Sequence, residues 1–330
     1  MIDFKKLLFF LAMILFFYIL YLLIVQRQRI QQYINEQTRN ESETIQESFA
    51  SIPYIDSTKN TDLSLKEYMI MSSWNSAVDK NGNVSLDTLE KTIERGYRFL
   101  DMEIYLVDKS PYVGFSSDKS YNTMESDPVL LYDVCQKILA KAFVTNNHKD
   151  PMLLHLRIKS TSDTVFNQIA DILESVFEKY LYRKKVNGNT KLEEIMGKIV
   201  IIVDRTYIPQ ISKYSCEDNC RHDFIQLTNT YSGTGVLKSV KEHYKLDQMK
   251  RPLEISTEGK SNVEDWQMVT LGVGEYYRTN NTKHFYTLAE AHSVQIIPQR
   301  VSSKDEHLME YEDFFKRNGK RAFVPITVIL

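Results

Sequence analysis

RFLDMEIY, at residues 98–105, is an apolar run interrupted by two acids, and it predicts a buried strand. Because side chains alternate along a strand, Asp101 and Glu103 share one face. Helical patterns lie on both sides of this strand, at residues 86–96 and 129–143. The stretch therefore predicts a strand between two helices, with two carboxylates on the same side.

The same alternation continues along the chain. Strand-like runs at residues 68–71, 152–158 and 199–203 accompany a further helical pattern at residues 165–181. Strands separated by helices of this length indicate a mainly parallel sheet. The pattern extends over about 260 residues, which favours a closed (β/α) barrel. A doubly wound open sheet is the alternative, although no glycine-rich phosphate loop follows an early strand.

The composition excludes several classes of protein. The chain has 330 residues, 41 Lys and Arg against 43 Asp and Glu, and 43% hydrophobic residues. These values exclude a disordered chain, a collagen-like repeat, a polytopic transporter and a globally basic nucleic-acid binder. Three cysteines are too few for a disulfide scaffold, so a hydrophobic core must hold the fold. We expect no nucleic-acid partner.

An uncharged segment lies near the start of the chain. Residues 7–25, LLFFLAMILFFYILYLLIV, would span roughly 28 Å as a helix, close to the thickness of a bilayer core. A cleavable signal peptide is the rival interpretation, but the polar sequence QRQRIQ at residues 26–31 follows in place of small residues. We therefore predict a tail at residues 1–6 and a single-pass membrane helix whose partner is the lipid bilayer.

The remaining chain divides into two parts. Residues 26–60 are rich in Gln, Glu, Asn, Ser and Thr and predict a polar stalk, followed by a globular domain at residues 61–330. Asn40, Asn83 and Asn280 lie in glycosylation sequons, which permit but do not establish an orientation away from the cytosol. The orientation of the domain stays open.

Two motifs carry a specific family resemblance. YMIMSSWN at residues 68–75 and GYRFLDME at residues 96–103 resemble the Y-x-I-x-S-S-H-N and G-C-R-x-x-E-x-D stretches of phosphoinositide-specific phospholipase C. Shorter matches follow in register at residues 151–156 and 198–201. The resemblance covers an X-like half at about 63–205 and, more loosely, a Y-like half at about 225–330. It implies a distorted TIM barrel with its active site at the carboxyl ends of the strands.

The resemblance also implies where catalytic groups should lie. The family uses one histidine to stabilise the pentacovalent phosphorane and a second as the general acid. Here Trp74 and Phe115 occupy these two positions, and no histidine precedes His148. An indole donates one hydrogen bond but has no proton that titrates near neutral pH. The replacements predict the loss of ordinary catalysis.

The implied calcium site is altered as well. Asn75, Asp101 and Glu103 retain oxygen atoms at three ligand positions, but Arg157 stands at the fourth. A guanidinium beside two carboxylates would form an ion cluster and oppose a divalent cation. Some bacterial members of the family use an arginine in place of calcium, so Arg157 alone does not exclude activity. In combination with Trp74 and Phe115, it predicts a vestigial site with no cofactor, and Ca²⁺ only if this site still functions.

A few further residues are weak candidates. Arg205 lies beside a strand that should carry phosphate-binding cations, and Gln295 replaces an arginine of the Y half. His155 and His292 could act as displaced general bases, although a hydrogen-bonded core histidine is the simpler interpretation.

Cys216 and Cys220, with His222 nearby, permit a zinc site or a local disulfide. The spacing lacks a second ligand pair, so we expect solvated loop thiols.

These observations favour a membrane-anchored, phospholipase C-like pseudoenzyme that acts as a structural or binding module. The alternative is an active phosphoric diester hydrolase on phosphoinositide or another phospholipid. The chain prefers Ile, Asn, Lys and Tyr to Ala, Gly and Pro, which suggests an AT-rich genome such as that of a protist or a large DNA virus. In a virus, the anchor would link an internal membrane of the virion to a protein shell. The sequence does not identify the protein partner.

Overall fold

The computed structural model describes residues 54–329, except for residues 117–126, 161, 206–213, 215, 217–219, 242–267 and 273–280. The expected membrane segment at residues 7–25 and most of the expected stalk lie outside the described residues. Among the described helices, none is long and apolar enough to cross a membrane.

A parallel sheet is built around β3 (Phe99–Val107). Its buried residues are consecutive rather than alternating, as expected for a strand covered on both faces. β2 (Ser72–Ser73) pairs in parallel with β3 on one side. On the other side the parallel order continues through β6 (Met152–Ile158), β7 (Ile199–Asp204), β8 (Thr230–Ser232), β9 (Leu237–Lys241) and β10 (Met268–Gly272). The predicted α/β architecture and parallel sheet are confirmed.

The two edges of this sheet meet the segment around residues 296–299. Single parallel bridges join Thr270 of β10 to Ile296, Ile296 to Ile70, and Ser73 of β2 to Gln299. The backbone N–H of Trp74 also donates to the carbonyl of Gln299, at 2.8 Å. These contacts are individual residue pairs rather than a continuous ladder. Next to them, β1 (Tyr68–Ile70) pairs antiparallel with β11 (Phe323–Pro325).

Part of the sheet departs from the parallel pattern. β4 (Ser110–Gly114) pairs antiparallel with β3, and β5 (Val129–Leu130) pairs antiparallel with β4. The β3–β4 hairpin turns at Asp108 and Lys109, which both have positive φ, at 47° and 66°. Two such residues match the backbone twist of tight hairpins. The hairpin returns the chain toward the middle of β3.

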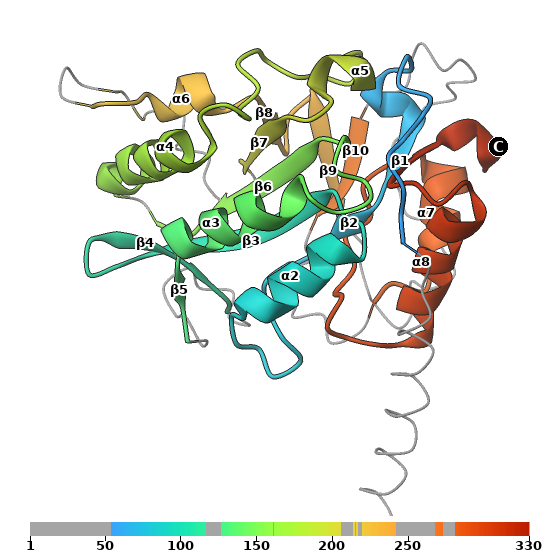
Figure 1. Ribbon diagram of the computed structural model, residues 1–330, viewed down its shortest axis with the longest axis horizontal. Helices are drawn as coiled ribbons and strands as arrows, with labels where there is room; N and C mark the ends of the chain where they lie inside the picture. The colour runs from blue at the N-terminus through green and yellow to red at the C-terminus, as the bar shows by residue number, and fades with distance from the viewer. Residues whose placement is uncertain are drawn as a thin grey trace, which may run out of the picture. The chain divides into compact units, whose positions relative to one another are not determined.

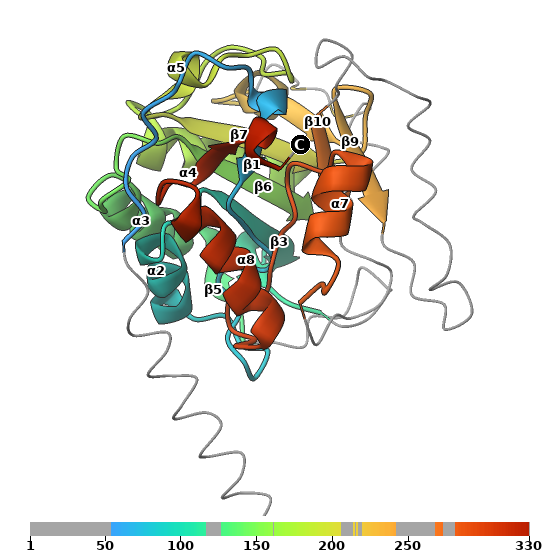
Figure 2. The same ribbon diagram turned by 90° about the vertical axis from the view of Figure 1, so that its right-hand side faces the viewer.

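Helices cover the sheet on two sides. α2 (Leu86–Glu94), α3 (Leu131–Ala142) and α4 (Asp163–Phe177) lie side by side along the strands (Figure 1), and they confirm the three predicted helices. α7 (Phe285–His292) and α8 (Glu306–Arg317) lie together on another flank (Figure 2). The short elements are η1 (Leu65–Glu67), α5 (Leu192–Ile195), α6 (Phe224–Leu227) and η4 (Ile326–Val328).

The last residues of the expected stalk belong to the folded unit. Ile55 is 2% exposed and packs on Gly96, where a Cβ atom would lie 2.5 Å from that of Ile55. The backbone N–H of Thr58 donates to Asp150 Oδ1 at 2.7 Å. Residues 54–60 of the expected stalk are thus part of the folded unit, to which the buried side chain of Ile55 and the backbone N–H of Thr58 fasten them.

Asp150 generates a prediction on stability. Burial raises its pKa to about 6, despite hydrogen bonds from Thr58 and the nearby charge of Arg98. The folded chain thus binds this proton more tightly than the unfolded chain, and the stabilisation is lost as pH rises through about 6. The free energy of unfolding should therefore decline as pH rises toward about 6. We expect Asp150→Asn to flatten this decline, measured by urea titration of the full chain at a series of pH values. Asp313→Asn, at an ion pair with Arg317, should keep the wild-type slope. An unchanged slope in Asp150→Asn would contradict the assignment.

Candidate functional site

The guanidinium of Arg157 lies at the centre of a buried polar cluster. It donates from Nε to Asp101 Oδ1 at 2.8 Å and from Nη2 to Asp101 Oδ2 at 2.6 Å. It also donates from Nη1 to Glu103 Oε1 at 2.6 Å and from Nη2 to Asn75 Oδ1 at 2.7 Å. Parallel pairing of β3 with β6 sets Glu103 opposite Arg157, which explains why the side chains meet. The structure thus brings together all four residues of the expected vestigial site.

The cluster keeps the carboxylate of Asp101 charged. Burial alone would raise the pKa of Asp101, but the charge of Arg157 and hydrogen bonds from His155 and Arg157 hold this pKa well below its ordinary value. Tyr105 donates its hydroxyl to Glu103 Oε2 at 2.7 Å. Burial and the adjacent Glu103 raise the pKa of Tyr105, so its hydroxyl remains a donor.

Trp74 and Asn75 lie at the start of a turn beside the cluster. Asn75 has a φ of 43°, in the left-handed region that asparagine tolerates, and its backbone N–H donates to Asp101 Oδ2 at 3.0 Å. Trp74 packs edge-on to Phe115, with ring centroids 6.4 Å apart. Within the described part of the chain, Trp74 Nε1 and Asn75 Nδ2 are buried donors without a partner. An unpaired buried donor costs about 1–3 kcal/mol, so both would favour a bound acceptor oxygen.

His155 lies between an acid and a hydroxyl. Its Nδ1 is 2.7 Å from Asp101 Oδ1, and its Nε2 is 2.7 Å from Ser232 Oγ. Its ring stacks on Phe99, with centroids 5.3 Å apart. Ser232 is also 3.2 Å from Asp204 Oδ1. The sequence motifs did not indicate Ser232, and its position at the end of a strand before a glycine was the only available signal.

The other candidates lie outside the cluster or beyond the described side chains. Arg205 stacks its guanidinium over Tyr231 at 5.5 Å, and its backbone N–H donates to the carbonyl of Ser232. Gln295 is fully buried, and its side chain donates to the backbone carbonyl of Lys66 at 3.1 Å. Lys66 lies just before the start of β1. The structure therefore does not bring Gln295 to the site. The side chain of His292 is outside those described.

The cluster does not fit a calcium ion. Arg157 already occupies oxygen atoms of Asp101, Glu103 and Asn75, which would be the ligands. Among the residues that the structure describes, no group of three or more His, Cys, Asp or Glu side chains could hold a metal. A calcium ion would have to displace a guanidinium from two carboxylates.

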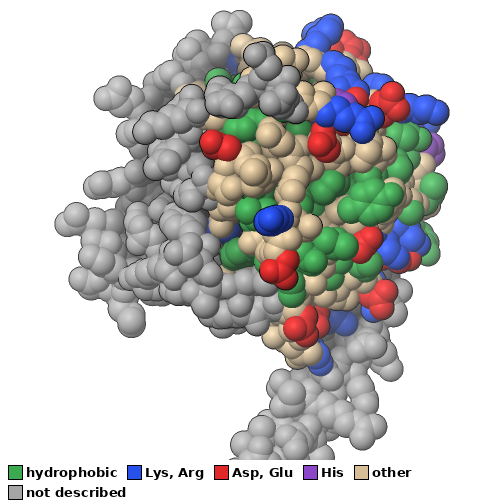
Figure 3. All heavy atoms as spheres, turned by 90° about the vertical axis from the view of Figure 1, so that its left-hand side faces the viewer, with side chains coloured by type: hydrophobic (Ala, Val, Ile, Leu, Met, Phe, Trp, Pro, Cys, Tyr) green, Lys and Arg blue, Asp and Glu red, His purple; other side chains and the backbone are tan. Residues whose placement is uncertain are grey.

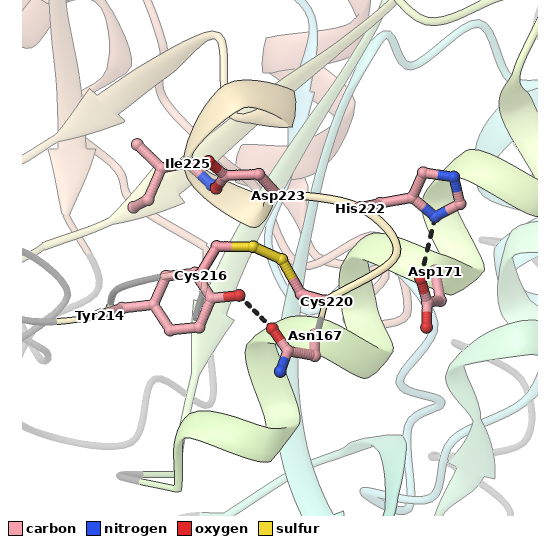
Figure 4. Close-up of a disulfide and its surroundings, with 8 residues drawn as sticks. All are labelled: Asn167, Asp171, Tyr214, Cys216, Cys220, His222, Asp223 and Ile225. Atoms are coloured by element: carbon pink, nitrogen blue, oxygen red, sulfur yellow. Dashed lines mark hydrogen bonds and ion pairs between the residues drawn. A yellow bond between two sulfur atoms is a disulfide. The ribbon is translucent and has the colours of Figure 1, made fainter. Parts of the chain in front are cut away.

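Cys216 and Cys220 form a disulfide, which corrects the expectation of solvated thiols. Figure 4 shows the bridged loop beside α4, where Tyr214 contacts Asn167 and His222 Nδ1 lies 2.9 Å from Asp171 Oδ1. Spacing alone could not decide this, because pairing depends on how the loop folds against the helix. The bridged sulfurs also exclude a thiolate zinc site at these two residues.

Acidic and basic side chains are interspersed at the surface. Figure 3 shows both signs on the described part of one face. Arg183 pairs with Glu174 at 2.7 Å, and Lys137 pairs with Glu90 at 2.6 Å. In these pairs a neighbouring acid of the same protein, rather than an anionic ligand, balances the charge of the basic side chain.

Comparison with known proteins supports the family resemblance. Residues 61–205 match the model of the phosphatidylinositol-specific phospholipase C X domain. The crystal structure of L. pealei PLC21 has a TM-score of 0.60 and 16% sequence identity, over 82% of this chain and 38% of that one. S. officinalis PLC21 has a TM-score of 0.57 at the same identity and coverage. No curated protein matches the sequence.

The resemblance to phosphoinositide-specific phospholipase C is thereby confirmed for the first half of the domain. The match spans 38% of the length of each PLC21 protein, so it shows a common fold rather than a common activity.

Arg157 should be essential for stability. We expect Arg157→Met to lose about 3–5 kcal/mol of unfolding free energy at neutral pH, because it leaves Asp101 and Glu103 as unpaired buried charges. The loss should shrink as pH falls, since protonation removes those charges. Arg183→Met is the matched control, because Arg183 is half exposed in its pair with Glu174. It should lose less than about 1 kcal/mol. Equal losses in the two variants, measured by urea titration, would contradict the central role of Arg157.

Proposed function

We propose that the chain is a membrane-anchored phospholipase C-like protein that has lost phosphodiester cleavage and acts as a binding or structural module. Residues 7–25 would hold it in the bilayer. The described domain would present its surface to a protein partner or a lipid headgroup.

The hydrogen bonds of Arg157 carry this proposal. Catalysis by the family requires a cation or free donors that neutralise charge on the phosphate. Among the described residues, Arg157 supplies the only guanidinium of the Asp101–Glu103 cluster. It donates to both carboxylates and to the amide oxygen of Asn75. At 2% exposure it is held inside the protein rather than offered to a ligand.

Two aromatic side chains support the same conclusion. Trp74 and Phe115 are 6% and 4% exposed and pack against each other. At these positions the family resemblance expects histidines that transfer protons. Neither ring has a proton that titrates near neutral pH, so neither replaces a general acid.

We also interpret the fold as a closed barrel. Seven parallel strands, β2, β3, β6, β7, β8, β9 and β10, are joined by the segment at residues 296–299, which bridges both edges. That segment would be the eighth strand of the TIM-type ring.

One observation favours the alternative, an active phosphodiesterase. His155 is held by Asp101 with its second nitrogen on a hydroxyl, which is a suitable position for a general base. A second histidine near the substrate would still be required for the leaving group.

A hydrolysis assay separates these functions. We expect the full chain, purified in detergent and mixed with phosphatidylinositol vesicles, to release no inositol phosphate above the protein-free rate. Addition of Ca²⁺ or of a chelator should change nothing, because Arg157 occupies the ligand oxygens. A phospholipase of known activity serves as the positive control. Turnover that disappears in His155→Gln or His292→Gln would overturn the pseudoenzyme proposal and establish the alternative.

Membrane attachment is tested separately. We expect the full chain to float with neutral lipid vesicles in a density gradient, resistant to high salt, since a buried apolar helix does not depend on charge. A chain lacking residues 1–25 should stay at the bottom. Flotation of the shortened chain would place the attachment in the domain and contradict the predicted anchor.

If the chain is a virion protein, the same anchor would link an internal membrane of the virion to the protein shell.

A further inference from the structure

We propose that Asp101, His155 and Ser232 form a serine nucleophile site for carboxylic esters, beside the Arg157 cluster. The two contacts of His155, to Asp101 Oδ1 and to Ser232 Oγ, are both 2.7 Å. A carboxylate that orients an imidazole, with the other ring nitrogen on a hydroxyl, is how many hydrolases activate serine. This chemistry differs from phosphodiester cleavage and does not rest on the proposed function.

The charge of Asp101 sets the direction of the proton path. Both oxygens of Asp101 accept hydrogen bonds from Arg157, and a carboxylate bonded in this way acts only as an acceptor. His155 Nδ1 must therefore carry a proton. In a neutral imidazole, Nε2 is then the acceptor, so the hydroxyl of Ser232 donates to it. Asp204 Oδ1 is the more distant acceptor for this hydroxyl, at 3.2 Å.

The three groups are held in place by their neighbours. Phe99 stacks on the imidazole and restricts its plane. Arg157 and the backbone N–H of Asn75 fix both oxygens of Asp101. Such support keeps the hydrogen-bonding geometry ready before a substrate arrives.

Ser232 lies where a strand meets an open turn. It is the last residue of β8, and Gly233, with a φ of 77°, follows it at the surface. Ser232 is 1% exposed and the His155 side chain is 9% exposed, and the residue that follows Ser232, Gly233, is exposed. In strand-to-turn nucleophiles, the backbone N–H that follows the serine stabilises the oxyanion. Gly233 supplies the N–H in that position.

The proposed reaction has two balanced halves. Ser232 Oγ attacks the ester carbonyl carbon while its proton moves to His155 Nε2. The bond from that carbon to the alcohol oxygen breaks, and the alcohol leaves with this proton. Water then attacks the acyl-serine and gives a proton to His155. The bond to Ser232 breaks, the carboxylic acid leaves, and the proton returns to Ser232.

A fluorophosphonate probe tests the nucleophile directly. Attack forms a bond from Ser232 Oγ to phosphorus and expels fluoride, while His155 accepts the proton. We expect an adduct on Ser232 in the full chain, located by peptide mass spectrometry. Labelling should be absent at this position in Ser232→Ala and about 100-fold slower in His155→Gln. Thr234→Ala should label at the wild-type rate, since its hydroxyl is in the same turn but bonds the carbonyl of Tyr231.

Hydrolysis of p-nitrophenyl butyrate gives a second readout, and it should be lost with the label. Thermal unfolding shows whether each variant is folded. If Ser232→Ala does not fold, Ser232→Cys replaces it, and iodoacetamide should alkylate the new thiol faster when His155 is present. A folded wild-type chain without an adduct on Ser232, or equal labelling in His155→Gln, would overturn the proposal. Neither result depends on whether inositol phosphate is released, so the two proposals can fail separately.

Discussion

The guanidinium of Arg157 is the interaction on which the interior of the domain depends. It connects β6 to β3 through Asp101 and Glu103, and to the turn through Asn75. Without a cation, each carboxylate would carry a desolvation cost of several kcal/mol inside the sheet. With it, Asp101 stays ionised, binds the backbone N–H of Asn75 and orients His155. One buried charge therefore positions a loop and two strands.

The scaffold and its chemistry have different requirements. Core positions accept many apolar residues, so a fold can persist at 16% identity. A proton-transfer site accepts very few residue types. Trp74 and Phe115 satisfy the packing requirement at positions where the resemblance expects histidines, but they cannot satisfy the chemical one. Similarity of fold consequently says little about which reaction the interior supports.

Local patterns predicted much of the fold and the acid–arginine part of the site. Asp101 and Glu103 share a face because of strand periodicity, and the motif register sets Arg157 opposite them. The contact of His155 with Ser232 could not be predicted, because 77 residues separate them and the position of β8 depends on tertiary packing. Likewise, nothing local in a polar stretch indicates that Ile55 is buried.

The placement of hydrogen-bond donors has different consequences for a phosphodiester and for a carboxylic ester. A phosphodiester is an anion and needs several cationic donors in its transition state, but the donors of Arg157 are directed at protein oxygens. A neutral carboxylic ester requires fewer hydrogen-bond donors and no cation. Its developing oxyanion needs one or two N–H groups, and its nucleophile needs a base. His155 and the exposed Gly233 turn can meet that demand without disturbing the ion cluster. Arg157 donates to Asp101, Glu103 and Asn75, and in doing so it holds Asp101 in the position that the proposed serine site requires.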